Sequence, residues 1–348
     1  MQVSNKTDIR NISFEDLKKY LKDSGELEFR AKQISDWLWN KSAQSFDEMN
    51  NLSKSLREKL GQNFTINAAA ISQSQFSADK TIKNTFRLFD GNIIEGVLIP
   101  ADERMTACVS SQVGCSLTCK FCATGYMDRK RNLDPGEIYD QVVLIDKQSR
   151  EQYGQPLTNI VYMGMGEPLL NYSNVLKSIE YITGEEGLNM AARRVTVSTA
   201  GIAKMIKKLG DDKVKFNLAL SLHAANDKKR NEIMPINEQN SLKALAEALR
   251  YYFAKTKNPV TYEYIIFKDF NDELQDAAEL AKFCKHIPCK VNIIEYNPIS
   301  FASFLNAEED KTEAFANYLL KQGIRANIRR SRGKDIDAAC GQLAVKEQ

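Results

Sequence analysis

From residue 104 onward, short apolar runs rich in β-branched residues alternate with amphipathic stretches. This alternation is the feature that most limits the fold. The six runs are TACVSS, NIVYMG, RVTVST, KFNLALSL, VTYEYIIF and KVNIIEY. Strands separated by helical segments predict a parallel sheet with right-handed crossovers. We therefore expect an α/β fold with a partial (β/α)6 barrel over residues 104–300, whose loops at the carboxyl ends of the strands meet on one rim.

Smaller units are expected on either side of this barrel. Ser13 followed by Asp16 resembles a capping box, and apolar residues recur at helical intervals in three early stretches, 14–22, 29–39 and 53–60. Asp90 and Gly91 lie between two β-rich runs, which is typical of a hairpin. The predicted parts are a helical accessory domain (1–62), a β-hairpin linker region (63–103), the barrel (104–300) and a C-terminal segment (301–348).

The composition is that of a soluble globular protein, with 348 residues of which 43% are apolar and 27% charged. No apolar run approaches the roughly 20 residues of a membrane span, and the start MQVSNKTDIRN lacks the apolar core of a signal peptide. We expect a cytoplasmic protein with no membrane partner. In that reducing compartment, the seven cysteines are better interpreted as metal ligands, catalytic groups or core residues than as a disulfide framework.

Three of these cysteines, Cys115, Cys119 and Cys122, follow the spacing CxxxCxxC on a predicted loop. Three thiolates leave one iron of a [4Fe-4S] cluster without a protein ligand, and a chelating substrate can occupy that position. Structural zinc usually takes four ligands in paired clusters, and no second pair with that spacing exists. A zinc-containing RNA-binding module stays open as an alternative, because Cys108 is a conceivable fourth ligand.

Five motifs in order carry a resemblance to a known family: CVSSQVGCSLTCKFCATG, YMGMGEPLLN, SLHA, EYNP and DIDAACGQL. With the FRAKQISDWLW stretch, they make nearly the whole chain similar to the radical S-adenosylmethionine (SAM) enzymes that methylate adenine C2 in 23S rRNA and tRNA. A C8-methylating family is the close alternative, and no residue separates the two. The resemblance implies a barrel of the radical SAM type, a [4Fe-4S] cluster on the three motif cysteines, and two molecules of SAM per turnover.

The resemblance also implies roles for two further cysteines. Adenine C2 lies between two ring nitrogens and has no acidic hydrogen, so a radical route replaces simple displacement. The bound cluster supplies the electron that cleaves SAM to a 5′-deoxyadenosyl radical. Cys340 is implied as the methyl carrier, and Cys108 as the thiol that resolves a covalent RNA intermediate through a transient disulfide. Taken alone, a cysteine in DAACGQL is as readily a small buried hydrophobe.

Binding of SAM is expected at the strand ends. In MGMGEP, glycine permits close approach to a ligand, although such a glycine pair by itself predicts an ordinary turn. The resemblance assigns Gly166 and Glu167 to the methionine amino group. It assigns the ribose, carboxylate and adenine contacts to Ser198, Ser221, Leu222, His223 and Asn297. Without the resemblance, His223 is better interpreted as a packed structural histidine.

A catalytic base and an RNA surface complete the expectations. The resemblance makes Glu95 a proton acceptor near the adenine, and removal of a proton after radical addition requires a base; the ordinary alternative is a solvent-facing carboxylate on an edge strand. The stretch from Lys321 to Lys334 has six basic residues and no acidic one, which predicts phosphate contacts or a solvated face. Implied partners are 23S rRNA, tRNA and a low-potential electron donor such as flavodoxin or ferredoxin.

Overall fold

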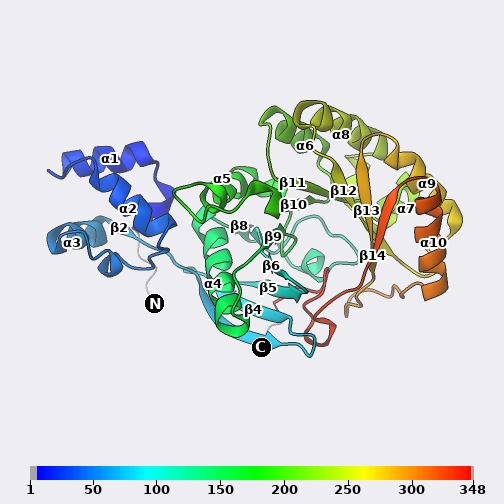
Figure 1. Cartoon of the computed structure of the whole chain (residues 1–348), viewed down its shortest axis with the longest axis horizontal. Helices are drawn as coiled ribbons and strands as arrows, with labels where there is room; N and C mark the ends of the chain where they lie inside the picture. Colours follow the sequence, from blue (N-terminus) through cyan, green and yellow to red (C-terminus); the bar gives the residue numbers. More distant parts are fainter. Residues whose placement is uncertain (1–5, 346–348) are drawn as a thin grey trace.

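The computed structural model describes residues 6–345, in which a ten-stranded mixed sheet forms the centre of the molecule (Figure 1). The strand order is β14-β13-β12-β11-β10-β9-β6-β5-β4-β3. Neighbours from β6 to β14 run parallel, and those from β3 to β6 run antiparallel. The strands are β3 (Ala70–Phe76), β4 (Ile82–Arg87), β5 (Ile93–Ala101), β6 (Arg104–Cys108), β9 (Asn159–Tyr162), β10 (Val195–Thr199), β11 (Asn217–Ser221), β12 (Val260–Ile266), β13 (Cys289–Glu295) and β14 (Arg325–Arg329).

The six predicted strands appear as β6 and β9 to β13, which confirms the α/β class and the partial barrel. The sequence did not predict β14, which pairs in parallel with β13 and extends the sheet at its edge. This segment reads RANIR and lies inside the basic run, and it alternates exposed with partly buried side chains. An edge strand with one open face can carry charged side chains. The basic composition of this segment therefore did not indicate a strand.

Helices connect the parallel strands and cover the outer face of the sheet (Figure 1). The longest begins at a capping box formed by Asp134 and Glu137, with proline at its first position, and ends at Tyr153, where it is capped by Gly154, whose φ is 67°. The helices are α4 (Pro135–Tyr153), α5 (Tyr172–Thr183), α6 (Ala203–Asp211), α7 (Asp227–Ile233), α8 (Leu242–Thr256), α9 (Leu274–Cys284) and α10 (Glu309–Lys321). None of the helices among residues 6–345 is long and apolar enough to cross a membrane.

Three helices at the N-terminal end confirm the helical stretches expected there: α1 (Phe14–Asp23), α2 (Arg30–Trp39) and α3 (Lys54–Asn63). As expected, Ser13 caps α1, with its Oγ accepting from the amide of Asp16 at 3.0 Å. This helical unit packs against α4 and α5. The buried Arg10 donates to Asp140 on α4 at 2.8 Å, and the Trp39 ring stacks on Tyr181 of α5 with centroids 3.5 Å apart.

The predicted hairpin is formed by β4 and β5, with the turn at Asp90 and Gly91. Gly91 has a φ of +81°, and the Asp90 carboxylate accepts from the amide of Asn92 at 3.0 Å. However, β5 is an interior strand, because it pairs with β6 on its other side. The edge-strand interpretation of Glu95 is therefore wrong, and this residue is only 5% exposed.

Candidate active site

The cysteine motif lies on a loop over residues 114–130 that is closed at its base by the antiparallel pair β7 (Gln112–Val113) and β8 (Arg131–Asn132). Two glycines permit its path. A Cβ on Gly114, whose φ is +75°, would lie 2.1 Å from the Asp128 carbonyl oxygen. A Cβ on Gly125 would lie 2.7 Å from the Cys119 carbonyl oxygen. Side chains at these positions would collide with backbone, so the loop shape depends on glycine.

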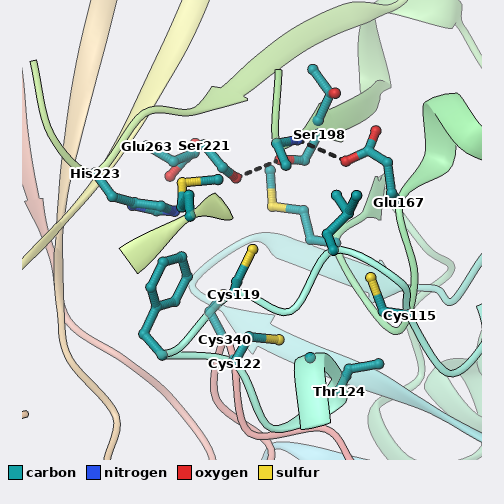
Figure 2. Close-up of a pocket in the computed structure, with 18 of the residues that line it drawn as sticks. Cys115, Cys119, Cys122, Thr124, Glu167, Ser198, Ser221, His223, Glu263 and Cys340 are labelled. Carbon is teal, nitrogen blue, oxygen red and sulfur yellow. Dashed lines mark hydrogen bonds between the residues drawn. The ribbon is translucent and has the colours of Figure 1, made fainter. Parts of the chain in front are cut away.

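The loop brings the sulfur atoms of Cys115, Cys119 and Cys122 to one pocket (Figure 2). Burial raises the pKa of Cys115 to about 11, and burial with repulsion from the other two thiols raises the pKa of Cys119 well above its ordinary value. A bound metal replaces the proton of such thiols. Among residues 6–345, no three His, Cys, Asp or Glu side chains converge closely enough to hold one metal ion. Three separated thiols fit a cluster, in which each thiolate binds a different iron, better than a zinc ion.

The loop after β9 forms the next wall. Gly166 has a φ of +95°, and a Cβ there would lie 2.5 Å from Cβ of Gln112. The adjacent Glu167 is 3% exposed, and its carboxylate accepts from the amides of Leu169 at 3.0 Å and Ala200 at 2.7 Å. Burial raises the pKa of Glu167 above its ordinary value. The carboxylate is thus held in one orientation at the pocket by the loops after two strands.

Ser198 on β10 and Ser221 at the end of β11 lie opposite the cysteines, with their Oγ atoms 3.3 Å apart (Figure 2). His223 also lines the pocket, but its Nδ1 accepts from the amide of Ile265 at 3.0 Å. Burial lowers the pKa of His223 to about 3, so the ring is neutral. These contacts support the structural interpretation of the imidazole, and they leave only Nε2 for a ligand.

Two residues assigned to SAM by resemblance, Leu222 and Asn297, are not part of the pocket wall. Leu222 is fully buried. Asn297 donates through Nδ2 to the Cys340 carbonyl oxygen at 3.2 Å, while its buried Oδ1 has no hydrogen-bond partner. Asn297 therefore touches the C-terminal segment directly and retains one unused acceptor.

Cys340 lies in the pocket wall beside the three motif cysteines (Figure 2). Two hydrogen bonds hold its segment on the cysteine loop: the Ala123 amide donates to the Gly341 carbonyl at 2.7 Å, and Thr124 Oγ1 donates to the Leu343 carbonyl at 2.6 Å. Cys108, at the end of β6, is 7% exposed and does not line the pocket. Burial raises the pKa of Cys108 to about 12, and the charge of the Cys340 thiolate acts in the same direction.

Glu95 lies behind the same C-terminal segment. Its carboxylate is 3.3 Å from Nζ of the equally buried Lys83 and accepts from the Ala344 amide at 3.0 Å. Burial raises the pKa of Glu95, and the positive charge of Lys83 opposes that shift. The carboxylate is thus a buried group in contact with the Cys340 segment.

Sequence reasoning missed Glu263 and Arg329, which both line the pocket. Glu263 is 4% exposed, accepts from Asn292 at 2.9 Å, and has an Oε2 without a partner. A single carboxylate in the apolar run VTYEYIIF was an available signal for it. Arg329 was counted only as part of the basic run. That run is less available to RNA than its composition indicates, because Arg330 and Lys334 both pair with Glu295 at 2.6 Å.

Comparison with known proteins decides the family. Residues 7–66 match the family described as "Ribosomal RNA large subunit methyltransferase N-terminal domain", and residues 109–281 match "Radical SAM superfamily". "Probable dual-specificity RNA methyltransferase RlmN" of Cytophaga hutchinsonii is 65% identical over 97% of this chain and 93% of its own length. The chain belongs to the RlmN family of radical SAM methyltransferases. The protein of the same description from Flavobacterium johnsoniae is 53% identical over 100% of this chain and 99% of its own.

A solved structure supports the assignment to the RlmN family. The radical SAM methyltransferase from Sphaerobacter thermophilus superposes with a TM-score of 0.91 at 39% identity, covering 97% of this chain and 99% of that one. These matches confirm the resemblance to radical SAM RNA methyltransferases that the sequence motifs indicated. They also confirm the enzyme class and the use of SAM with a [4Fe-4S] cluster. The zinc-containing module, in contrast, has no support from these matches.

Proposed function

We propose that this RlmN-family enzyme methylates C2 of an adenine in 23S rRNA, at the peptidyl transferase centre, and of an anticodon-loop adenine in tRNA. The observation that carries the proposal is the position of Cys340, which shares one pocket with Cys115, Cys119 and Cys122. A methyl group on its sulfur would face the place where SAM is cleaved. The description "dual-specificity RNA methyltransferase" of the relatives supports RNA as the substrate and two kinds of site.

In the proposed site, Cys115, Cys119 and Cys122 hold the cluster, which when bound delivers the electron that cleaves SAM. The carboxylate of Glu167 faces the methionine ammonium, and its two backbone hydrogen bonds fix its orientation. The ribose, carboxylate and adenine of SAM are bound by Ser198, Ser221, Leu222, His223 and Asn297. Of these, Leu222 would act from behind the pocket wall, because its side chain is buried away from the pocket and its backbone amide donates to the Glu263 carbonyl at 2.9 Å.

The Cys340 thiolate first attacks the methyl carbon of one SAM, and S-adenosylhomocysteine leaves. A second SAM, cleaved with one electron, yields methionine and the radical, which takes a hydrogen atom from the Cys340 methyl group. The resulting methylene radical adds to C2 of adenine and joins the enzyme to RNA. The cluster, when bound, would take back the one electron that the adduct loses. Loss of the C2 proton then restores the aromatic ring, and Glu95 accepts that proton.

Cys108 then resolves the covalent intermediate. Its thiolate attacks the Cys340 sulfur, a disulfide forms, the sulfur–methylene bond breaks, and the methylene carbon takes a proton to become the methyl group. An external thiol later reduces the disulfide. The electron for SAM cleavage comes from a low-potential donor such as flavodoxin or ferredoxin, and the RNA substrates place the reaction in the cytoplasm.

Mass spectrometric mapping of modified adenosines in rRNA and tRNA tests this function directly. A strain lacking the gene is compared with the same strain carrying the wild-type gene or Cys340→Ala. We expect 2-methyladenosine in both RNAs only with the wild-type gene. The appearance of 8-methyladenosine would shift the assignment to C8, and methylation by Cys340→Ala would exclude the carrier role.

A further inference from the structure

Arg230, on α7, is a fully buried arginine behind the cysteine loop. Its guanidinium donates four hydrogen bonds, and all of them end on neutral oxygens. The acceptors are the carbonyls of Leu222 (3.0 Å), Ala200 (2.6 Å) and Ser221 (3.2 Å), and Oδ1 of Asn237 (2.6 Å). The nearby Asp227 carboxylate is instead hydrogen-bonded by Asn237 and by the Leu242 amide. A buried cation that makes no direct ion pair costs several kcal/mol. Asp227 offsets this cost only through the intervening Asn237 amide, so a second anion nearby would stabilise the charge further.

The cysteine loop, which packs against the end of α7, supplies a site for a second anion. The Lys120 amide donates to the carbonyl of Ile233, the last residue of α7, at 3.0 Å. Ile233 and Phe121 belong to one apolar cluster, and Cys119 packs against it. Burial lowers the pKa of Arg230 to about 10, and the negative charges of the Cys119 thiolate and of Asp227 oppose that shift. The C-terminal end of α7, one turn after Arg230, therefore packs on the loop of a proposed cluster ligand across an apolar region, where charges interact strongly.

We propose that Arg230 is the fixed counter-charge of the [4Fe-4S] cluster and raises its reduction potential. A cluster held by three thiolates is an anion, and one-electron reduction by the low-potential donor adds another negative charge. A buried cation behind Cys119 stabilises the reduced form more than the oxidised form. Net charge and hydrogen bonding around a cluster are the means by which proteins set such potentials. The inference rests on the ligand assignment made under the proposed function.

A purely architectural role is the competing explanation. The Ala200 peptide accepts from Arg230 through its oxygen and donates to Glu167 through its nitrogen. Loss of the guanidinium donors of Arg230 would therefore also disturb the Glu167 carboxylate, which is proposed to bind SAM. The reduction potential of the cluster is therefore measured without SAM and without RNA. Under these conditions Glu167 binds no ligand, so a change in potential reports the charge of Arg230 rather than its support of Glu167.

The test is an EPR-monitored redox titration of the full-length, anaerobically reconstituted protein, with iron content and thermal unfolding measured alongside. Arg230→Gln removes the charge, Arg230→Lys keeps the charge but loses the fork, and Lys120→Gln removes an exposed charge next to Cys119. We expect a more negative potential for Arg230→Gln, a nearly wild-type potential for Arg230→Lys, and no change for Lys120→Gln, since solvent screens exposed charges.

A wild-type potential in iron-loaded Arg230→Gln would overturn the proposal. If Arg230→Gln does not retain iron, the lysine variant decides: recovery of iron by Arg230→Lys supports the counter-charge, and continued loss shows that the fork is what matters. Failure of the ligand assignment itself is recognised separately, by full iron content in Cys119→Ala. If the enzyme does not methylate RNA, the proposed function fails, but the measured cluster potentials still test the role of Arg230.

Discussion

At the scale of single residues, the two site thiols are proposed to act at different times. Cys340 forms the bond to RNA, and Cys108 is needed only to break it. We therefore expect Cys108→Ala to accumulate protein joined to RNA through a methylene on Cys340, because its resolving thiolate is missing. The adduct should survive denaturing electrophoresis and disappear after ribonuclease treatment.

The double variant Cys108→Ala with Cys340→Ala is the matched control for this adduct. It should carry no RNA after denaturation, because electrostatic binding does not survive denaturant. Normal turnover by Cys108→Ala would show that Cys108 is only a buried cysteine at the end of β6. That outcome would assign resolution to another nucleophile.

The pair formed by Lys83 and Glu95 leads to a pH prediction. Burial raises the pKa of Glu95 and Lys83 opposes this, so the base is lost as pH falls through a pKa above the ordinary range. In Lys83→Met the opposition disappears and the pKa rises further. The acid limb of the rate of RNA methylation should therefore move to higher pH, whereas Lys83→Arg should keep it near the wild-type position.

Single-turnover assays with Cys340 already methylated provide the measurement. Formation of 5′-deoxyadenosine serves as the internal control, since SAM cleavage precedes proton removal and should keep its own pH profile. An acid limb that stays in place in Lys83→Met would separate this pair from the catalytic proton transfer.

At the scale of elements, the cysteine loop has little freedom to change. In Gly125→Ala, the new Cβ would lie 2.7 Å from the Cys119 carbonyl. We expect the loop to shift at a cost of about 1–3 kcal/mol, with most of the iron lost after anaerobic reconstitution. Iron and sulfide analysis measures the loss. Gly61→Ala is the control, because the nearest atom to its Cβ, on Phe46, is at an ordinary 3.8 Å; equal iron in both variants would contradict the steric argument.

Elements differed in how well the sequence predicted them. Among the barrel strands, β12 is buried along its whole length, and β9, β10, β11 and β13 each contain buried residues, so their β-branched runs are conspicuous. In contrast, β14 has an open edge and carries Arg325 and Arg329. The charges of β14 indicate a solvated surface segment, whereas the segment is a strand. Its conformation depends on pairing with β13. The same pairing places Arg329 in the pocket, which no local pattern predicts.

At the scale of the molecule, the motifs predicted the pocket because each one follows a strand and the carboxyl ends of the strands share a rim. Glu167 lines it from the loop after β9, and Ser198 and Ser221 line it from β10 and β11. Arg230 could not be found in this way. Its neighbours in DKKR suggest a solvated helix face, and its burial arises only when α7 packs beneath the cysteine loop. Long-range packing of this kind leaves no local periodicity in the sequence.

The N-terminal helical unit is attached to α4 and α5 of the barrel through a small set of side chains. Trp39 stacks on Tyr181 of α5, and its carbonyl accepts from the Tyr139 hydroxyl of α4. In Trp39→Ala we expect this interface to lose about 3–5 kcal/mol, as for other buried aromatic truncations. Limited proteolysis should then cut faster between residues 64 and 70, where the chain leaves the unit. RNA methylation should fall while SAM cleavage persists.

Trp37→Ala is the matched control for this prediction, because Trp37 lies on the same helix but contacts Asn51 and Lys41 within the helical unit. It should lower the stability of that unit without releasing the unit from α4 and α5. The two variants are therefore expected to differ in where the protease cuts first: at residues 64–70 in Trp39→Ala, and inside the helices in Trp37→Ala. Identical cleavage patterns would show that the Trp39 stack does not hold the two parts together, and that Arg10 with Asp140 is sufficient.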